Sequence, residues 1–155
     1  MADVIYQGGM KALADGDLQT APDIRLMLVM GSFSGVSGGG EEDAINMADF
    51  AVLDEFDGIG YQEIDAANVT FTYDAVANEY QLKFDAGEFN APAGSIAPGS
   101  GDYIGLLVKL YVDGTLANDI AVGFTQSGGF PANAANGAIA YTPDTAGALF
   151  LRAAP

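Results

Sequence analysis

Hydrophobic and polar side chains alternate most regularly in two neighbouring stretches of the chain, 69–74 and 80–85. A period of two in segments rich in β-branched and aromatic residues is typical of strands that bury one face. The break at 75–78 is long enough for a four-residue hairpin loop, in which Asn78 suits a left-handed backbone position. We therefore expect a β-hairpin here, and we expect it to be the central hairpin of a β-sandwich.

Two further segments give strong strand signals, 102–113 and 119–126, and the turn sequence Asp113-Gly114 separates them. We expect these two segments to pair with each other. The row expected on one face of the first strand is Ile104, Leu106, Val108, Leu110 and Val112.

The segment 23–30 is also expected to form a strand. Its first face is Ile24, Leu26, Leu28 and Met30. The second face begins with Arg25 and continues with Met27 and Val29, so we predict that the far end of this strand is covered on both sides.

The only convincing helical signal is the segment 7–15, where Met10, Leu13 and Ala14 share a face. Gly16 follows at a position where helices commonly end. The segment 2–6 is expected to be a short strand or an arm that reaches a neighbouring subunit.

The remaining segments are expected to be shorter or irregular. The loop 31–43 is rich in glycine and acidic residues, 44–54 is expected to start as a helical turn and continue as a strand, and 86–101 is expected to be a long irregular connection. Two short strands are expected at 138–141 and 148–151.

Seven or eight strands at this spacing, with one short N-terminal helix, predict an all-β fold. We expect a single β-sandwich or jelly-roll-like domain over 1–155, in which 1–22 forms an N-terminal arm and the short helix. We find no domain boundary and no internal repeat.

The charge of the chain excludes several classes of partner. Twenty-one acidic residues face five basic ones, which gives a formal net charge of −16. Nucleic acids and anionic membranes both need cationic contact surfaces, so we expect neither as a partner. The chain has no cysteine, shows no signal-peptide pattern and has no apolar run near the roughly 20 residues that span a bilayer. We expect a soluble, unsecreted protein.

The surface is expected to be unusually poor in charge. Only 17% of residues are charged and 50% are hydrophobic, whereas about 25% are charged in an average domain. One explanation is a β protein rich in small residues that keeps acidic loops for solubility. The explanation that we favour is that other subunits cover much of the surface.

The sequence offers little for catalysis. Without histidine it lacks the commonest general base and any Ser-His-Asp triad, so the nucleophile-elbow pattern around Ser37 is attributed to chance. The carboxylate groups at 41–43 and at 54–57 could serve a glycosidase, and those of Asp15 with Asp17 and of 54–58 could bind calcium, but solvated acidic loops explain them better. We expect no catalytic residue, no cofactor and no metal site.

Several large apolar residues are candidates for contacts with other subunits, because aromatic anchors are favoured at interfaces. Tyr103 and Tyr111 lie on the strand face opposite the apolar row, and Phe33 stands among glycines. The six candidates are Tyr6, Phe33, Val36, Tyr103, Tyr111 and Phe130.

A series of short motifs occurs in a fixed order along the chain. These motifs are D-I-R-L-M-L-V at 23–29, G-I-G-Y at 58–61, N-V-T-F-T-Y-D at 68–74, the strand at 106–111 followed by Asp113-Gly114, and the apolar segment at 147–151. In this order the chain resembles a group of small virion proteins of tailed bacteriophages.

The resemblance implies a non-enzymatic decoration or cement protein with a β-sandwich fold, located in the virion. Its implied partners are the major capsid protein and copies of itself in a homotrimer, on the outer surface of the head. A tail, adaptor or fibre-base protein of the same virion is the first alternative. A module that binds carbohydrate or a host surface is the second.

Overall fold

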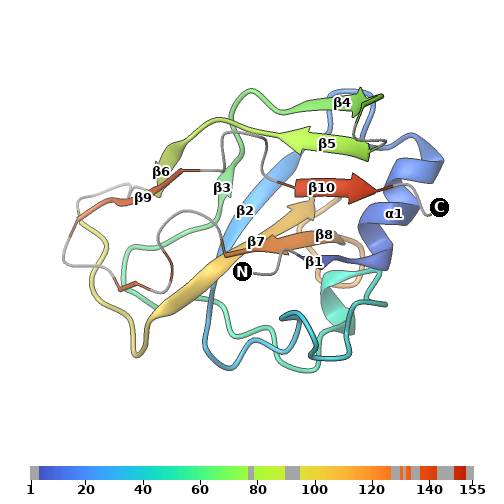
Figure 1. Cartoon of the computed structure of the whole chain (residues 1–155). Coiled ribbons are helices and arrows are strands. Elements are labelled where there is room, and N and C mark those ends of the chain that lie inside the picture. The colour runs from blue at the N-terminus through green and yellow to red at the C-terminus, as the bar shows by residue number, and fades with distance from the viewer. Residues whose placement is uncertain are drawn as a thin grey trace.

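The computed structural model describes residues 4–76, 79–89, 95–126, 130, 132–133, 137–142 and 149–152. In chain order the elements are β1 (Val4–Ile5), α1 (Gln7–Asp15), β2 (Ile24–Met30), the 3₁₀ helix η1 (Met47–Asp49), β3 (Ile64–Asp65), β4 (Thr70–Asp74), β5 (Glu79–Lys83), β6 (Gly87–Phe89), β7 (Tyr103–Leu110), β8 (Ile120–Thr125), β9 (Ile139–Tyr141) and β10 (Leu149–Arg152) (Figure 1). The fold is all-β with one short α-helix, as the sequence predicts.

The largest sheet has five strands in the order β1-β8-β7-β2-β3, all of them antiparallel to their neighbours. Its middle strand is β7, and both faces of β7 and of β2 are buried. The hairpin β4–β5 forms, but it belongs to a three-stranded sheet of order β10-β5-β4, in which β4 is an edge strand. The expectation that this hairpin is central is therefore wrong: β4 lies at the edge of a small sheet, and its residues are exposed or half-buried.

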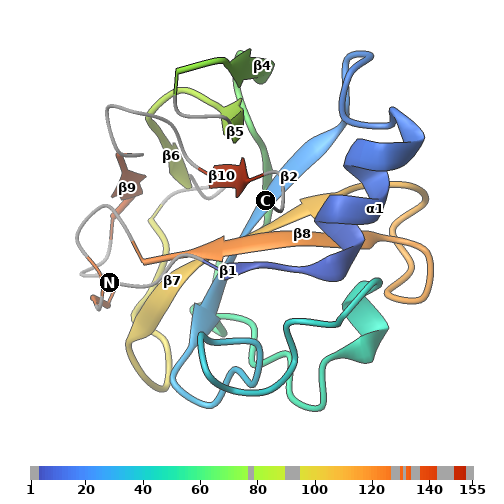
Figure 2. The same ribbon diagram turned by 45° about the vertical axis from the view of Figure 1, so that its right-hand side comes forward.

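The main hydrophobic core lies between the five-stranded sheet and a second layer, which consists of α1 and two small sheets (Figures 1 and 2). The small sheets are β10-β5-β4 and the pair β6-β9. One face of β2 points into this core with Ile24, Leu26, Leu28 and Met30. We call this side of the large sheet its helix face.

A second core lies on the opposite side of the large sheet, which we call the loop face. Met27 and Val29 of β2 pack there against Phe33, Met47 and Phe50 of the coil that follows the strand. The sequence prediction that the far end of β2 is covered on both sides is confirmed.

The glycine-rich loop 31–43 packs on this second core through Phe33 and Val36, while most of its other residues are exposed. Gly35 allows the rings of Phe33 and Phe50 to approach its backbone closely, and its carbonyl accepts a 2.5 Å hydrogen bond from Tyr6 Oη. The strand expected after the helical turn in 44–54 is not formed. Instead η1 is followed by coil, in which Val52 exchanges hydrogen bonds with Ser34.

A β-bulge interrupts the alternation of β7. Val29 pairs with Gly105, whereas Met30 pairs with Tyr103, so Ile104 is an extra residue on β7. As a result Ile104 packs on the loop face, while Leu106 faces the main core. The expected apolar row is thus wrong at Ile104, and also at Val112, which lies beyond the strand and is exposed.

Helix α1 has the bounds that the sequence predicts, and it ends at Gly16 with a φ of 84°. Its buried residues are Gly8, Gly9 and Ala12, whereas Ala14 is exposed, contrary to expectation. A Cβ on Gly9 would lie 2.5 Å from the carbonyl oxygen of Val122, so the helix packs on β8 almost backbone to backbone. Neither helix in the described part of the chain is long and apolar enough to cross a membrane.

Candidate functional site

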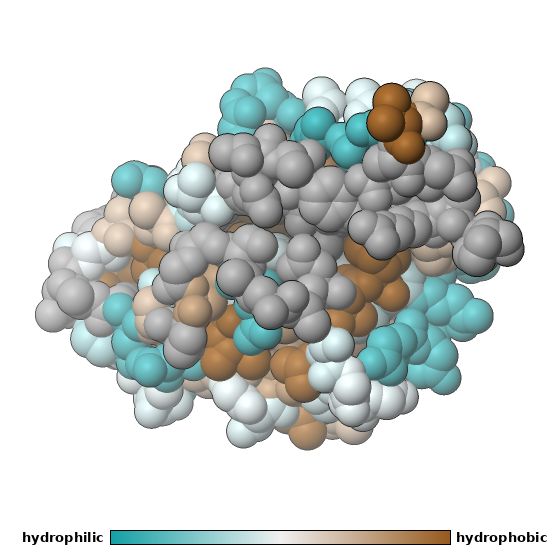
Figure 3. All heavy atoms as spheres, viewed as in Figure 1, coloured by the Kyte–Doolittle hydropathy of each residue, from teal (hydrophilic) through white to brown (hydrophobic). Residues whose placement is uncertain are grey.

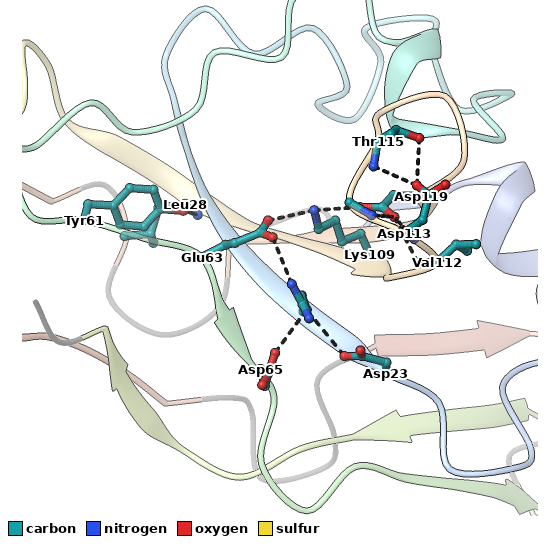
Figure 4. A network of polar contacts seen from close by, with 12 residues as sticks. Asp23, Leu28, Tyr61, Glu63, Asp65, Lys109, Val112, Asp113, Thr115 and Asp119 are labelled. Carbon is teal, nitrogen blue, oxygen red and sulfur yellow. Dashed lines mark hydrogen bonds and ion pairs between the residues drawn. The ribbon is translucent and has the colours of Figure 1, made fainter. Parts of the chain in front are cut away.

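The most strongly interacting charged groups form a row across three strands of the large sheet. Arg25 on β2 is directly opposite Lys109 on β7 and, on its other side, opposite Asp65 on β3. Strand alternation places Arg25 on the loop face with Met27 and Val29. Figure 4 shows that the carboxylates of Glu63 and Asp119 extend this row into a continuous network.

Lys109 is the buried centre of the network, with a side chain that is 4% exposed. Its Nζ lies 2.7 Å from Glu63 Oε2 and 2.9 Å from Oδ2 of Asp119, whose side chain is fully buried. Burial lowers the pKa of the Lys109 ammonium, but the hydrogen bonds to Glu63 and Asp119 outweigh burial, and the net pKa is raised. Lys109 is therefore a cation and not a free amine base or nucleophile.

The second oxygen of Asp119 organises the loop between β7 and β8. Asp119 Oδ1 accepts backbone hydrogen bonds from Val112 at 2.9 Å, Asp113 at 3.3 Å and Gly114 at 3.1 Å. Burial raises the pKa of the Asp119 carboxyl, but these bonds and the bond from Lys109 lower it by more. Asp119 is an anion whose oxygens already have donors, so it is poorly suited to proton transfer.

Arg25 is held by an aromatic ring and several carboxylates. The centre of its guanidinium lies 3.4 Å from the centroid of the Tyr111 ring, a cation–π contact. Arg25 Nε lies 3.1 Å from Asp65 and 3.5 Å from Asp23, as ion-pair contacts without hydrogen-bond geometry. Arg25 Nη1 lies 3.6 Å from Glu63 Oε1, and Glu63 also binds Lys109.

Tyr61 and Glu55 lie next to the network. Tyr61 Oη accepts a 2.8 Å hydrogen bond from the backbone N–H of Leu28, and burial raises the pKa of the phenol. Desolvation and the nearby Glu63 carboxylate raise the pKa of the Glu55 carboxyl, although Glu55 remains partly in contact with solvent. Perturbed carboxyl groups of this kind are candidates for acid–base roles, but the phenol that hydrogen-bonds to Glu55, that of Tyr61, has a pKa raised by burial and is a poor nucleophile.

The network thus cross-links β2, β3, β7 and the loop 112–119. Its two cations, Arg25 and Lys109, are paired with carboxylates, and both oxygens of the buried Asp119 carboxylate already accept hydrogen bonds. Among the described residues no group of three or more histidine, cysteine or acidic side chains could hold a metal ion. We conclude that the arrangement is suited to fixing the fold.

Other acidic residues that the sequence singles out accept hydrogen bonds from backbone and side-chain groups of the same chain. Glu41 accepts hydrogen bonds from Ser34 Oγ and the N–H of Ala51, and Glu42 accepts one from Gly38 N–H. Oδ1 of Asp57 accepts a 2.7 Å bond from Ser100 N–H. These hydrogen bonds show that the carboxylates of Glu41, Glu42 and Asp57 hold loop segments of the chain together.

Three of the six candidate interface residues are not exposed. Tyr6 is 0%, Phe33 2% and Tyr103 7% exposed. Tyr6 and Phe33 pack edge-on against Phe50 in the second core, and the ring of Tyr103 packs against Phe56. The interpretation of these three as exposed anchors is wrong, because the coil over the loop face and the bulge in β7 enclose them within the same chain.

The other three candidates are partly exposed. Tyr111 gives one ring face to Arg25, and Phe130 packs against Tyr103 with ring centroids 5.6 Å apart. Val36 lies at the edge of the second core. A role for Val36, Tyr111 and Phe130 in an interface remains a prediction.

Sequence reasoning missed the network around Lys109. A signal was present, because Lys109 is a single charge inside an otherwise apolar strand, and such a charge needs an opposite partner when it is buried. Glu63 could not be identified as a partner, since the pairing of β2 with β7 and β3 is long-range, whereas Asp119 lies only 10 residues away, at the far end of the predicted β7–β8 hairpin.

No protein-family model, no curated protein and no solved structure matches this chain. Arguments on its function therefore depend on its own residues and on the order of motifs described above. The distribution of charge is the most informative of these features.

Proposed function

We propose that this protein is a non-enzymatic structural protein of a bacteriophage virion, which binds the outer surface of the head and stabilises the capsid lattice. The observation that supports this proposal most directly is that most basic side chains are paired with carboxylates of the same chain. Three of the five basic side chains are neutralised within the chain, in ion pairs of Lys11 with Asp15, of Arg25 with Asp65 and of Lys109 with Asp119.

The charge left for partners is therefore strongly negative. With a formal net charge of −16, the protein is attracted by a basic surface and repelled by other acidic ones. A head shell offers many identical sites, so many weak contacts of this kind add up through multivalency. A trimer of the chain would increase that effect.

Exposed hydrophobic residues add a second type of contact. Val52, Ile59, Val112 and Leu116 are exposed in loops, and Val76 is 98% exposed in the turn of the β4–β5 hairpin. Figure 3 shows hydrophobic atoms at the outer end of this hairpin, next to hydrophilic ones. Single exposed apolar residues are common on monomeric proteins, so these residues add apolar contact area to the proposed interface without defining a patch of their own.

The proposal is tested by quantitative mass spectrometry of virions purified from the source of this sequence. A head decoration protein should be present in proportion to the major capsid protein. A much smaller copy number, matching tail or portal proteins, would favour the tail or adaptor alternative. Absence from the virion, or specific glycan binding by the purified protein, would contradict the proposal.

A further inference from the structure

A surface hollow of about 490 Å³ lies where β2 ends and β7 begins. This is the end of the large sheet that contains the bulge at Ile104. The hollow is lined by Met30, Gly31, Ser32, Asp54, Ser100, Gly101, Asp102 and Ile104. It lies away from the Lys109 network, and none of the roles described above uses it.

The walls of the hollow are fixed by hydrogen bonds. On one side Asp54 accepts a 2.7 Å bond from Ser32 N–H through Oδ2, and its backbone carbonyl accepts a 2.7 Å bond from Met30 N–H. On the other side Asn133 donates a 3.0 Å bond to the carbonyl of Gly101. A ligand would thus find both walls already in place, which reduces the entropic cost of binding.

The hollow combines apolar and acidic residues in its lining. Met30, from the helix face of β2, and Ile104, which the bulge in β7 places on the loop face, meet at this end of the sheet and supply the apolar part of the lining. Asp54 and Asp102 come from different segments and supply two carboxylates, and none of the lining residues is basic. Bulges commonly redirect a side chain towards a site in this way.

We infer that this hollow receives a basic side chain, an arginine in preference to a lysine, from the protein surface that the chain binds. The guanidinium carries five donors on a planar, permanently charged group that suits carboxylates, while its alkyl stem can pack on apolar side chains such as Met30 and Ile104. A bare metal ion would make no use of the apolar lining, and a neutral ligand would gain nothing from the negative charge of the two carboxylates. The inference rests on the proposed function, because it names the chemistry of the partner surface.

The test is an NMR titration of the ¹⁵N-labelled protein with N-acetyl-arginine methylamide. The amide signals of Gly31, Ser32 and Gly101 should shift saturably, at weak affinity because one side chain is a small ligand. The lysine analogue should bind more weakly, and the uncharged norleucine analogue should cause no saturable shift.

Variants separate the hollow from the general negative charge. Asp54→Asn combined with Asp102→Asn should weaken binding of the arginine analogue by about tenfold or more, since charge-assisted hydrogen bonds are lost. Asp102→Asn alone leaves the Asp54 wall intact and should lower the affinity in the same direction. The control, Asp17→Asn with Asp43→Asn, removes the same charge from exposed positions and should leave binding unchanged.

Three results would overturn the inference. They are shifts spread over the acidic surface, equal affinity in the Asp54→Asn/Asp102→Asn variant, and saturation of the same amides by calcium chloride at lower concentration than by the arginine analogue. If the arginine analogue fails to bind but the protein still binds heads, the inference that the hollow receives a basic side chain is refuted, and the proposed function stands. If the protein does not bind heads, the proposed function itself fails.

Discussion

At the scale of single residues, the buried ammonium of Lys109 is the feature with the largest energetic consequence. Two carboxylates hold it, and one of them, Asp119, also binds three backbone N–H groups. Removing one partner of a buried pair leaves the other charge without compensation, which costs more than the pair itself contributes. Asp119 is therefore more sensitive to substitution than the exposed acidic residues.

We predict that Asp119→Asn lowers the free energy of unfolding by about 3 kcal/mol, because it leaves the Lys109 ammonium with Glu63 alone. Urea denaturation followed by fluorescence or circular dichroism measures this change. The matched control is Asp65→Asn, whose side chain is 77% exposed in its ion pair with Arg25. It should cost less than about 1 kcal/mol. Equal effects of the two substitutions would contradict the account of the network.

The same residue predicts a loss of stability in acid. The folded-state pKa of the Asp119 carboxyl lies below the unfolded value of about 3.9. The ionised carboxylate therefore adds to the free energy of unfolding at pH values above the unfolded value. This stabilisation by the Asp119 carboxylate is lost as the pH falls through the folded-state pKa. Stability measured from pH 6 down to about pH 2 should fall less steeply in Asp119→Asn than in the unaltered protein. Parallel pH profiles of the two proteins would exclude Asp119 as the cause.

At the scale of elements, the contact between α1 and β8 depends on the absence of side chains. Gly8 and Gly9 are buried against the backbone of neighbouring segments, where a Cβ on Gly9 would meet the Val122 carbonyl at 2.5 Å. Alanine is the better helix former by about 1 kcal/mol, so the two effects oppose each other. Backbone cannot move aside easily, and the steric effect should dominate.

We predict that Gly9→Ala lowers the free energy of unfolding by about 1–3 kcal/mol despite the gain in helix propensity. Gly137→Ala is the matched control, because a Cβ there meets nothing within 4 Å. It should leave stability nearly unchanged or raise it slightly. A stabilised Gly9→Ala variant would show that α1 does not pack on β8 as closely as described.

Local patterns predicted the elements well. The helix 7–15 with its stop at Gly16, and the two-sided burial of the end of β2, follow from periodicity and capping preferences that act within a few residues. The pairing of β7 with β8 follows from the turn between them. These features need no knowledge of distant parts of the chain.

Features that depend on long-range packing could not be predicted. The bulge at Ile104 depends on how β7 pairs with β2, far away in the sequence, and it reverses the face of Ile104 without any change in the residue pattern. Tyr6, Phe33 and Tyr103 looked exposed because the sequence does not reveal that the loop 31–43 and its continuation cover the loop face. The hairpin β4–β5 was predicted correctly as an element and misplaced for the same reason.

At the scale of the whole molecule, the described structure pairs Lys11, Arg25 and Lys109 with carboxylates of the same chain, and the formal net charge is −16. We predict that binding to virion heads weakens as salt is added, because screening reduces the attraction between an acidic protein and a basic surface. Pelleting of the protein with heads at increasing sodium chloride measures this dependence. Affinity that does not change with salt would mean that apolar contacts alone hold the protein in place.

The most direct test of the proposed function is to add the purified protein to heads that lack it and to image the particles by electron cryomicroscopy. The account predicts additional density at symmetry-related positions on the outer surface of the shell, with the hollow around Asp54 and Asp102 facing a basic side chain of the lattice. Bare shells at saturating protein, with the protein remaining in solution as a monomer, would contradict it.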